Sequence, residues 1–274
     1  MKTEMESIQS KNSGQTTEKE QEKQLEKNRR RAFLGVQLKY TLTPICLLYG
    51  IVFAVLVGLF LFNWVTKVSG NGSDISFPAQ IRVLPLEIAF VTLIIGGQVI
   101  LNVGFSKQGK HELALLRIPL PEETKRLLRL GYSLLVTMSA FAVYFLMLNL
   151  LLVIENILAP ETAYGFAELY PAFYSFTHLY RVYPVANGMA WIALPVVIAN
   201  CSVMAPLVDE ARRKGEVKDA VWSAFALCEF LFYCFDEGNQ AADFVLMMLF
   251  GGVYIGRVFF AYRRRQKDDR AELV

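Results

Sequence analysis

The amino-acid sequence predicts an all-α polytopic membrane protein with six transmembrane helices. Three observations support this fold class. Hydrophobic residues make up 54% of the 274 residues. They are grouped in six long blocks rather than in periodic stripes. Lysine and arginine gather in every second connecting segment. Because about 20 apolar residues in a helix cover a hydrocarbon core of about 30 Å, blocks of this kind are typical of membrane spans.

The N-terminal region divides into two parts before the first block. Residues 1–28 carry almost no apolar side chains, so we predict a disordered cytoplasmic tail. Residues 29–42 alternate basic and apolar residues. This pattern predicts a cytoplasmic amphipathic helix lying in the headgroup region. An equally good interpretation is that the segment is the basic flank of the first span.

The six-helix transmembrane domain is predicted over residues 29–262 and is followed by a basic cytoplasmic tail, 263–274. Pro195 and Pro206 predict a kink in the fourth span. The pair Gly96–Gly97 and the GxxxG pattern Gly252–Gly256 are weak signals of close helix packing. The predicted spans are 43–65, 84–104, 131–154, 187–208, 220–236 and 241–262.

The distribution of basic residues predicts the orientation. With six spans and a cytoplasmic N-terminus, 24 of the 28 lysines and arginines lie on the inner side. Only Lys67, Arg82 and Arg181 fall in outer loops, and Arg257 lies within the last span. An odd number of spans would remove this bias. We therefore expect both termini inside, in the cytoplasmic membrane of a bacterial cell.

Polar residues inside the predicted spans need a physical reason, because burying charge in a bilayer is costly. Glu229 lies mid-span, and Asp236 follows seven residues later on a similar face. They line a cation or proton pathway, or they hydrogen-bond to neighbouring helices. Arg257 reaches toward the interface or pairs with Glu229. The candidates for a pathway or for interhelix contacts are Glu229, Asp236, Arg257, Asn149 and Asn200.

Motifs for other functions are missing from the sequence. His111 and His178 fall on opposite sides of the predicted membrane, so they do not form a metal site. The chain has no Walker motif, no HExxH and no GxSxG. We expect a protein that is not an enzyme, holds no metal or cofactor of its own and binds no nucleic acid.

Residues 105–130 form a long basic segment between the second and third spans. Its leucines recur near helical spacing on both sides of Pro119 and Pro121, between charged residues. Such a pattern is typical of helical turns with one apolar face each. Glu112, Glu122 and Glu123 would be repelled by anionic lipid, which favours a protein groove as the partner of these faces.

The stretch ELALLRIPLPEETKRLLRLGYSLL and the overall layout resemble the membrane subunits of ABC transporters of the type-two exporter class. In that family a cytoplasmic helix precedes six spans, and a segment between spans two and three docks on the ATPase. The family pattern is a short helix, a proline-containing turn and the basic start of span three. Here the same order is Leu115–Leu116, Pro119–Leu120–Pro121, Glu122–Glu123 and then 125–130.

The resemblance implies a permease that pairs with a second copy or homologue and with cytoplasmic ATPase subunits, which bind the ATP. Residues implied in coupling are Leu113, Leu115, Leu116, Arg117, Pro119, Leu120, Pro121, Glu122 and Arg126. One departure is that the large outer segment lies between spans three and four, whereas the family carries it between spans five and six. The alternative is a six-span membrane protein without transport activity, either an accessory or assembly subunit, or a small channel.

Overall fold

The computed structural model describes residues 2–69, 77–103, 114–160, 165, 179, 182–183, 190–214, 217–235 and 240–271. All regular secondary structure among these residues is helical, which confirms the predicted all-α class. The helices are α1 (Lys2–Ser69), α2 (Phe77–Ile81), α3 (Leu86–Val103), α5 (Glu122–Leu158), α8 (Ala190–Lys214), α9 (Val217–Phe235) and α10 (Gln240–Ala271).

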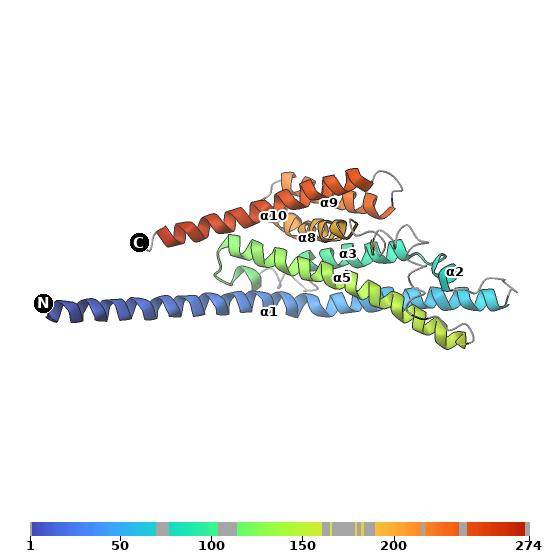
Figure 1. The fold of residues 1–274 in the computed structure, drawn as a ribbon, viewed down its shortest axis with the longest axis horizontal. Coiled ribbons are helices and arrows are strands. Elements are labelled where there is room, and N and C mark those ends of the chain that lie inside the picture. Colours follow the sequence, from blue (N-terminus) through green and yellow to red (C-terminus); the bar gives the residue numbers. More distant parts are fainter. Residues whose placement is uncertain are drawn as a thin grey trace.

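The long helices lie roughly along a common axis and alternate in direction (Figure 1). Both termini are therefore at the same end of the molecule, where α1 and α10 extend beyond the other helices. Each of the six predicted spans overlaps one helix, in the order α1, α3, α5, α8, α9 and α10, although the predicted spans 84–104, 187–208 and 220–236 extend beyond their helices. Helix α8 packs against α3, α5, α9 and α10, so it occupies the centre of the bundle.

Within the described ranges, three helical segments are long and apolar enough to cross a membrane: Gln24–Ser69, Glu122–Leu158 and Leu194–Ala211. Two further apolar helical segments, Leu86–Asn102 and Val221–Leu231, are shorter. These lengths and compositions fit a membrane protein.

Helix α1 differs from the prediction, because a single helix replaces the expected tail, interfacial helix and span. Pro44 lies inside it without ending it. One buried stripe runs through the helix on both sides of this proline, at positions 33, 37, 41, 45, 49, 52, 56 and 60. Packing of this stripe against α3 and α5 holds the helix together where proline removes a backbone hydrogen bond.

The predicted disorder of residues 1–28 also differs from the structure, in which α1 begins at Lys2. A helix already formed in the apolar part of the chain needs no new nucleus, and each added residue then gains one backbone hydrogen bond. The Lys, Glu and Gln residues that dominate 18–27 have good helix propensity.

The core near the middle of the bundle is aromatic. Phe90 lies 4.9 Å from Phe141, 5.1 Å from Tyr144 and 6.0 Å from Phe230, measured between ring centroids. The Tyr144 hydroxyl donates to the carbonyl of Leu86 at 3.2 Å. These rings come from α3, α5 and α9, so they join three helices at one level.

Glycines allow two close approaches between helices. A Cβ atom on Gly96 would lie 2.7 Å from Leu48 Cδ2, and one on Gly97 would lie 3.2 Å from Val136 Cγ1. The Gly96–Gly97 signal is thus confirmed as a packing site of α3 against α1 and α5.

The Gly252–Gly256 signal is wrong as a packing site within the chain, because a Cβ on either glycine would meet nothing within 4 Å. The close approach is made by Gly251, where a Cβ would lie 3.2 Å from Asn200 Cα. The packed face of α10 is therefore turned away from the GxxxG pattern.

Candidate functional site

The segment between α3 and α5 lies at the end of the bundle that carries both termini (Figure 1). Its described part begins with a helical turn at 114–116 and continues through a bend to Pro121, where α5 begins. The turn is closed by a hydrogen bond from the Ile118 amide to the Leu115 carbonyl at 3.4 Å. The Lys125 amide donates to the Pro121 carbonyl at 3.0 Å, which joins the segment to the first turn of α5.

Leu115 and Leu120 attach this segment to α1. They are only 3% and 7% exposed and form a small hydrophobic cluster with the fully buried Phe33. Val36, Ile118 and Leu128 pack around the cluster. The prediction that both halves of the segment turn their leucines toward a partner therefore does not hold for these two side chains. Their apolar surface is already buried within the chain.

Other residues of the segment face outward. Leu116 is 49% exposed, and Arg117 and Pro119 are also exposed. Glu122 is the exposed first residue of α5, while Pro121 is half-buried. Leu113 lies outside the described residues. The outward surface of the segment thus combines one large apolar side chain with a cation and an anion.

The start of α5 is held to the end of α8 by two ion pairs. Arg126 Nε lies 2.7 Å from Glu210 Oε1. Arg129 pairs with Asp209, and its guanidinium carbon lies 5.9 Å from the centre of the Phe33 ring. A third pair, Lys125 with Glu122 at 3.5 Å, lies within the first turn of α5. Because the Glu210 side chain is only 6% exposed, its charge needs a close cation.

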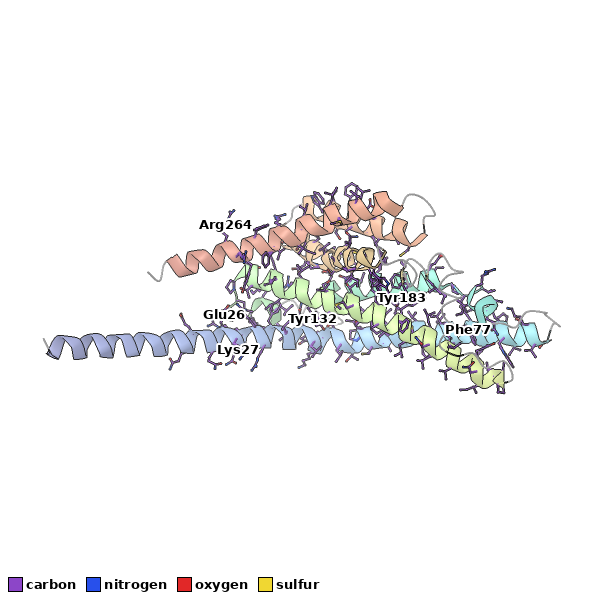
Figure 2. All side chains as sticks on the ribbon, in the orientation of Figure 1. Glu26, Lys27, Phe77, Tyr132, Tyr183 and Arg264 are labelled. Carbon is purple, nitrogen blue, oxygen red and sulfur yellow. The ribbon has the colours of Figure 1, made fainter. Side chains whose placement is uncertain are left out.

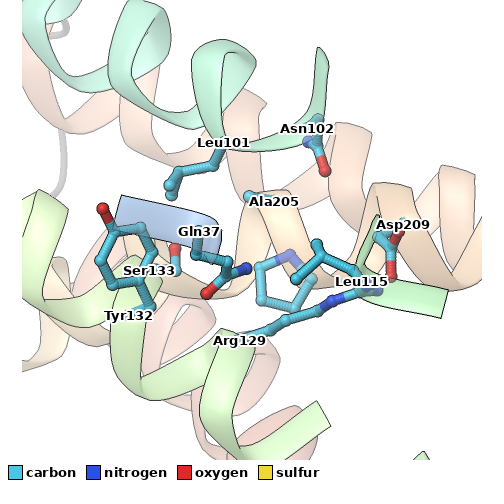
Figure 3. A pocket seen from close by; sticks show the side chains of 10 residues that line it. Gln37, Leu101, Asn102, Leu115, Arg129, Tyr132, Ser133, Ala205 and Asp209 are labelled. Carbon is cyan, nitrogen blue, oxygen red and sulfur yellow. Dashed lines mark ion pairs between the residues drawn. The ribbon is translucent and has the colours of Figure 1, made fainter. Parts of the chain in front are cut away.

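Two cavities flank these ion pairs. The outer one, of about 370 Å³, lies between the segment 114–121, α5 and α8 and is lined by Leu116, Glu122, Lys125, Arg126, Arg129, Asp209 and Glu210. The inner one, of about 30 Å³, is lined by both polar and apolar residues (Figure 3). It is lined by Gln37, Leu101, Asn102, Leu115, Arg129, Tyr132, Ser133, Ala205, Pro206 and Asp209. Arg129 and Asp209 line both cavities and so form the boundary between them.

A buried hydrogen-bond network continues from the inner cavity into the bundle. Ser133 Oγ donates to Gln98 Oε1 at 2.8 Å, and Gln98 Nε2 donates to Thr137 Oγ1 at 3.0 Å. The backbone amide of Ala205 also donates to Gln98 Oε1, at 3.2 Å. Gln98 thereby links α3 to α5 and α8, which fits the interhelix role expected of amides in apolar surroundings.

The predicted intramembrane candidates that the structure describes differ in their contacts and burial. Asn200 Nδ2 donates to the Ala226 carbonyl at 3.0 Å, so this amide joins α8 to α9. Asn149 donates to the Phe145 carbonyl of its own helix at 2.7 Å. Glu229 is buried, whereas Arg257 is exposed. Asp236 lies outside the described residues.

Sequence reasoning missed two acidic positions at the end of α8 and one at the end of α5. Asp209 and Glu210 directly follow the predicted fourth span, 187–208. Two adjacent acids at the same predicted end as Arg126 and Arg129 could have indicated the ion pairs. Glu155 directly follows the predicted third span, 131–154, and is fully buried.

The Glu155 carboxylate accepts hydrogen bonds from Gln80 Nε2, with both oxygens at 3.1 Å. Gln80 belongs to α2, so this contact fixes the short helix against the end of α5 farthest from the termini. Phe77, also in α2, marks that end in Figure 2, while Glu26, Lys27 and Arg264 lie toward the opposite one.

No group of three or more histidine, cysteine, aspartate or glutamate side chains that could hold a metal ion occurs within the described ranges. Comparison with protein-family models, with curated proteins and with solved structures gives no match.

Proposed function

We propose that the chain is the membrane subunit of an ABC transporter of the type-two exporter class. It spans the cytoplasmic membrane six times with both termini inside, and it moves a substrate with ATP hydrolysed by a separate ATPase. A second copy or a homologue completes the pathway. The ATPase docks on the coupling segment, residues 113–129, through the outward-facing side chains of that segment.

The membrane assignment is supported by the outer surface of α1. Leu47, Ile51 and Val55 are each more than half exposed, and Phe62 is 66% exposed. In water each such side chain would forgo about 1.5–3 kcal/mol of burial free energy. Surrounded by lipid tails, the same surface carries no such cost.

The observation that carries the proposal is the way in which the coupling segment is mounted. Leu115 and Leu120 fix it to α1, and its far end continues without a break into α5. Arg126 and Arg129 then join α5 to α8. A push on the exposed residues Leu116, Arg117 and Pro119 would therefore reach three long helices at once. This mounting suits a segment that receives the closing motion of an ATPase.

The test is co-purification from native membranes, with the bound subunits identified by mass spectrometry. We expect a cytoplasmic protein with Walker motifs to be recovered with the wild type. The double variant Leu116→Asp/Arg117→Glu changes two side chains that are exposed in the free chain. It should lower recovery of the ATPase about tenfold or more, because a leucine buried on docking contributes about 1.5–3 kcal/mol.

The matched control is Arg264→Glu, which reverses another exposed charge at the same end of the helix bundle. It should leave ATPase recovery unchanged at equal membrane abundance. Equal recovery with the wild type and the double variant would remove this segment as the coupling element. Absence of any ATPase would favour the alternative, an accessory subunit or small channel.

A further inference from the structure

The two ion pairs between α5 and α8 separate a wide outer cavity from a narrow inner one. Arg129 and Asp209 line both cavities, and Arg126 and Glu210 line the outer one. The pairs Arg126–Glu210 and Arg129–Asp209 therefore lie across the boundary between the end surface of the bundle and its interior. We call these four residues the α5–α8 latch.

The inner cavity has the properties of a small hydrated chamber. Its volume of about 30 Å³ exceeds the ~10–15 Å³ that one water molecule needs. Gln37 lines it and is only 5% exposed, and its Oε1 atom has no hydrogen-bond partner among the described residues. A buried amide oxygen without a partner is costly, so it calls for a water molecule or a polar solute in the chamber.

Polar groups lead from this chamber toward the middle of the bundle. Ser133 lines the chamber and bonds to Gln98, which in turn bonds to Thr137. Beyond them lies the aromatic cluster of Phe90, Phe141 and Tyr144. From the end of the bundle inward, the latch, the chamber and the polar network lie among α3, α5 and α8, and the aromatic cluster lies among α3, α5 and α9.

Helix α8 contains a weak point next to the latch. Pro206 lines the chamber and precedes Asp209 by three residues. Because proline has no backbone N–H, the Ser202 carbonyl loses the donor that an uninterrupted α-helix would give it. The last two turns of α8, which carry both latch acids, are thus joined to the rest of the helix by a weakened turn.

We propose that the chamber is the inner vestibule of a polar pathway along α3, α5 and α8, and that the α5–α8 latch closes it from the cytoplasm. This inference rests on the proposed transport function. Motion of the exposed residues 116–119 reaches Arg126 and Arg129, farther along the coupling segment, through the first turns of α5. Separation of the two ion pairs, with bending of α8 at Pro206, opens the chamber to water.

The experiment measures access to the chamber. The four native cysteines are replaced, and Ser133→Cys is introduced, since Ser133 is 1% exposed and lines the chamber. A membrane-impermeant maleimide is added to inside-out vesicles without ATPase, and the labelling rate is followed. We expect slow labelling with the latch intact. Arg126→Glu or Glu210→Arg should raise the rate about tenfold or more, which corresponds to about 1.4 kcal/mol.

The double variant Arg126→Glu/Glu210→Arg restores an opposite-charge pair and should return the rate toward that of the intact latch. Arg264→Glu is the control for an exposed charge reversal at the same end and should leave the rate unchanged. Where a reversal prevents membrane insertion, Arg126→Gln and Glu210→Gln provide the same comparison, with a smaller increase expected. A rate that does not respond to any latch variant would overturn the proposal, as would an increase that the double variant fails to reverse.

The result of the Ser133→Cys labelling experiment can be distinguished from the result of the ATPase co-purification. A latch response in a chain that binds no ATPase would support the gated chamber and remove the permease assignment. Recovery of an ATPase together with an unresponsive Ser133→Cys would support the permease and remove the latch.

Discussion

At the scale of single residues, buried polar groups in this bundle are used mainly to join helices. Gln98 and Asn200 each donate a side-chain amide hydrogen bond to another helix, at 3.0 Å in both cases. A glutamine or asparagine in apolar surroundings costs free energy unless its polar atoms are bonded. The same reasoning applies to Glu229, which is buried in α9.

For Glu229 we expect hydrogen bonding rather than charge to be the required property. Glu229→Gln keeps a polar side chain of the same length that can still form hydrogen bonds, so it should preserve membrane abundance and activity. Glu229→Leu removes this hydrogen bonding and should lower abundance. Quantitative blotting and a transport or ATPase assay of the purified complex measure both effects. If the amide variant assembles normally but is inactive, the carboxylate charge is functional and the structural interpretation is wrong.

Gly251 offers a sharper test of helix packing. A Cβ at this position would lie 3.2 Å from Asn200 Cα and 3.3 Å from the backbone nitrogen of Asn200. The backbone of α8, rather than a flexible side chain, would therefore have to shift. We expect Gly251→Val to separate α10 from α8 and cost about 1–3 kcal/mol, the usual range for overpacking. The midpoint of thermal unfolding of the detergent-solubilised protein should fall.

The matched control is its neighbour Gly252, where a Cβ would meet nothing within 4 Å. Gly252→Val should leave the midpoint nearly unchanged. Equal effects of the two substitutions would show that α10 does not pack on α8 through Gly251. A larger effect of the Gly252 substitution would instead point to its GxxxG face as a contact with another chain.

At the scale of elements, the coupling segment shows how neighbouring residues with the same side chain take different roles. Leu115 is 3% exposed and packs on Phe33, while Leu116 is 49% exposed. The spacing of the leucines indicates that the segment has an apolar face, but it does not indicate which element packs against that face. That choice depends on α1 passing beside the segment, a contact more than 80 positions away in the sequence.

Leu115→Ala should therefore loosen the segment from α1, while Leu116→Ala should not. Large-to-small changes at buried leucines cost about 2–5 kcal/mol, and exposed positions usually change stability by less than about 0.5 kcal/mol. Limited trypsin cleavage at Arg117 reports the attachment, and it should be faster only in the Leu115 variant. Faster cleavage in the Leu116 variant alone would reverse the assignment of the two leucines.

The helices themselves were predictable because long apolar blocks and helical structure are local properties of the sequence. The continuity of α1 was not predicted, because two positions of its buried stripe, Gln37 and Thr41, are polar. They interrupt the apolar periodicity by which a continuous buried helix face is recognised in a sequence. Thr41 satisfies its hydroxyl with the Gln37 carbonyl at 2.8 Å and with Tyr132 at 2.7 Å. The latch acids were missed for a similar reason, because their partners are set by the alignment of α5 against α8.

At the scale of the whole molecule, charge and topology agree. The antiparallel arrangement brings both termini and the segment between α3 and α5 to one end (Figure 1). The last turns of α8 and the start of α9 lie at this end as well, because α8 runs back toward it. These are the segments that hold 24 of the 28 lysines and arginines. Positive charge is retained on the cytoplasmic side of membranes, which is the basis for the proposal that this end faces the cytoplasm.

The resulting prediction is that single cysteines at Ser73, Thr162 and Lys214 differ in their access from outside the cell. In a cysteine-free background, an impermeant maleimide added to whole cells should label Ser73→Cys and Thr162→Cys but not Lys214→Cys. Permeabilising the cells should then expose Lys214→Cys, which controls for a thiol that is merely buried. Labelling of Lys214→Cys from outside, or protection of either outer position, would contradict six crossings with both ends inside. Either result would also exclude a cytoplasmic ATPase as the partner of the coupling segment, because this segment lies on the same side of the membrane as Lys214.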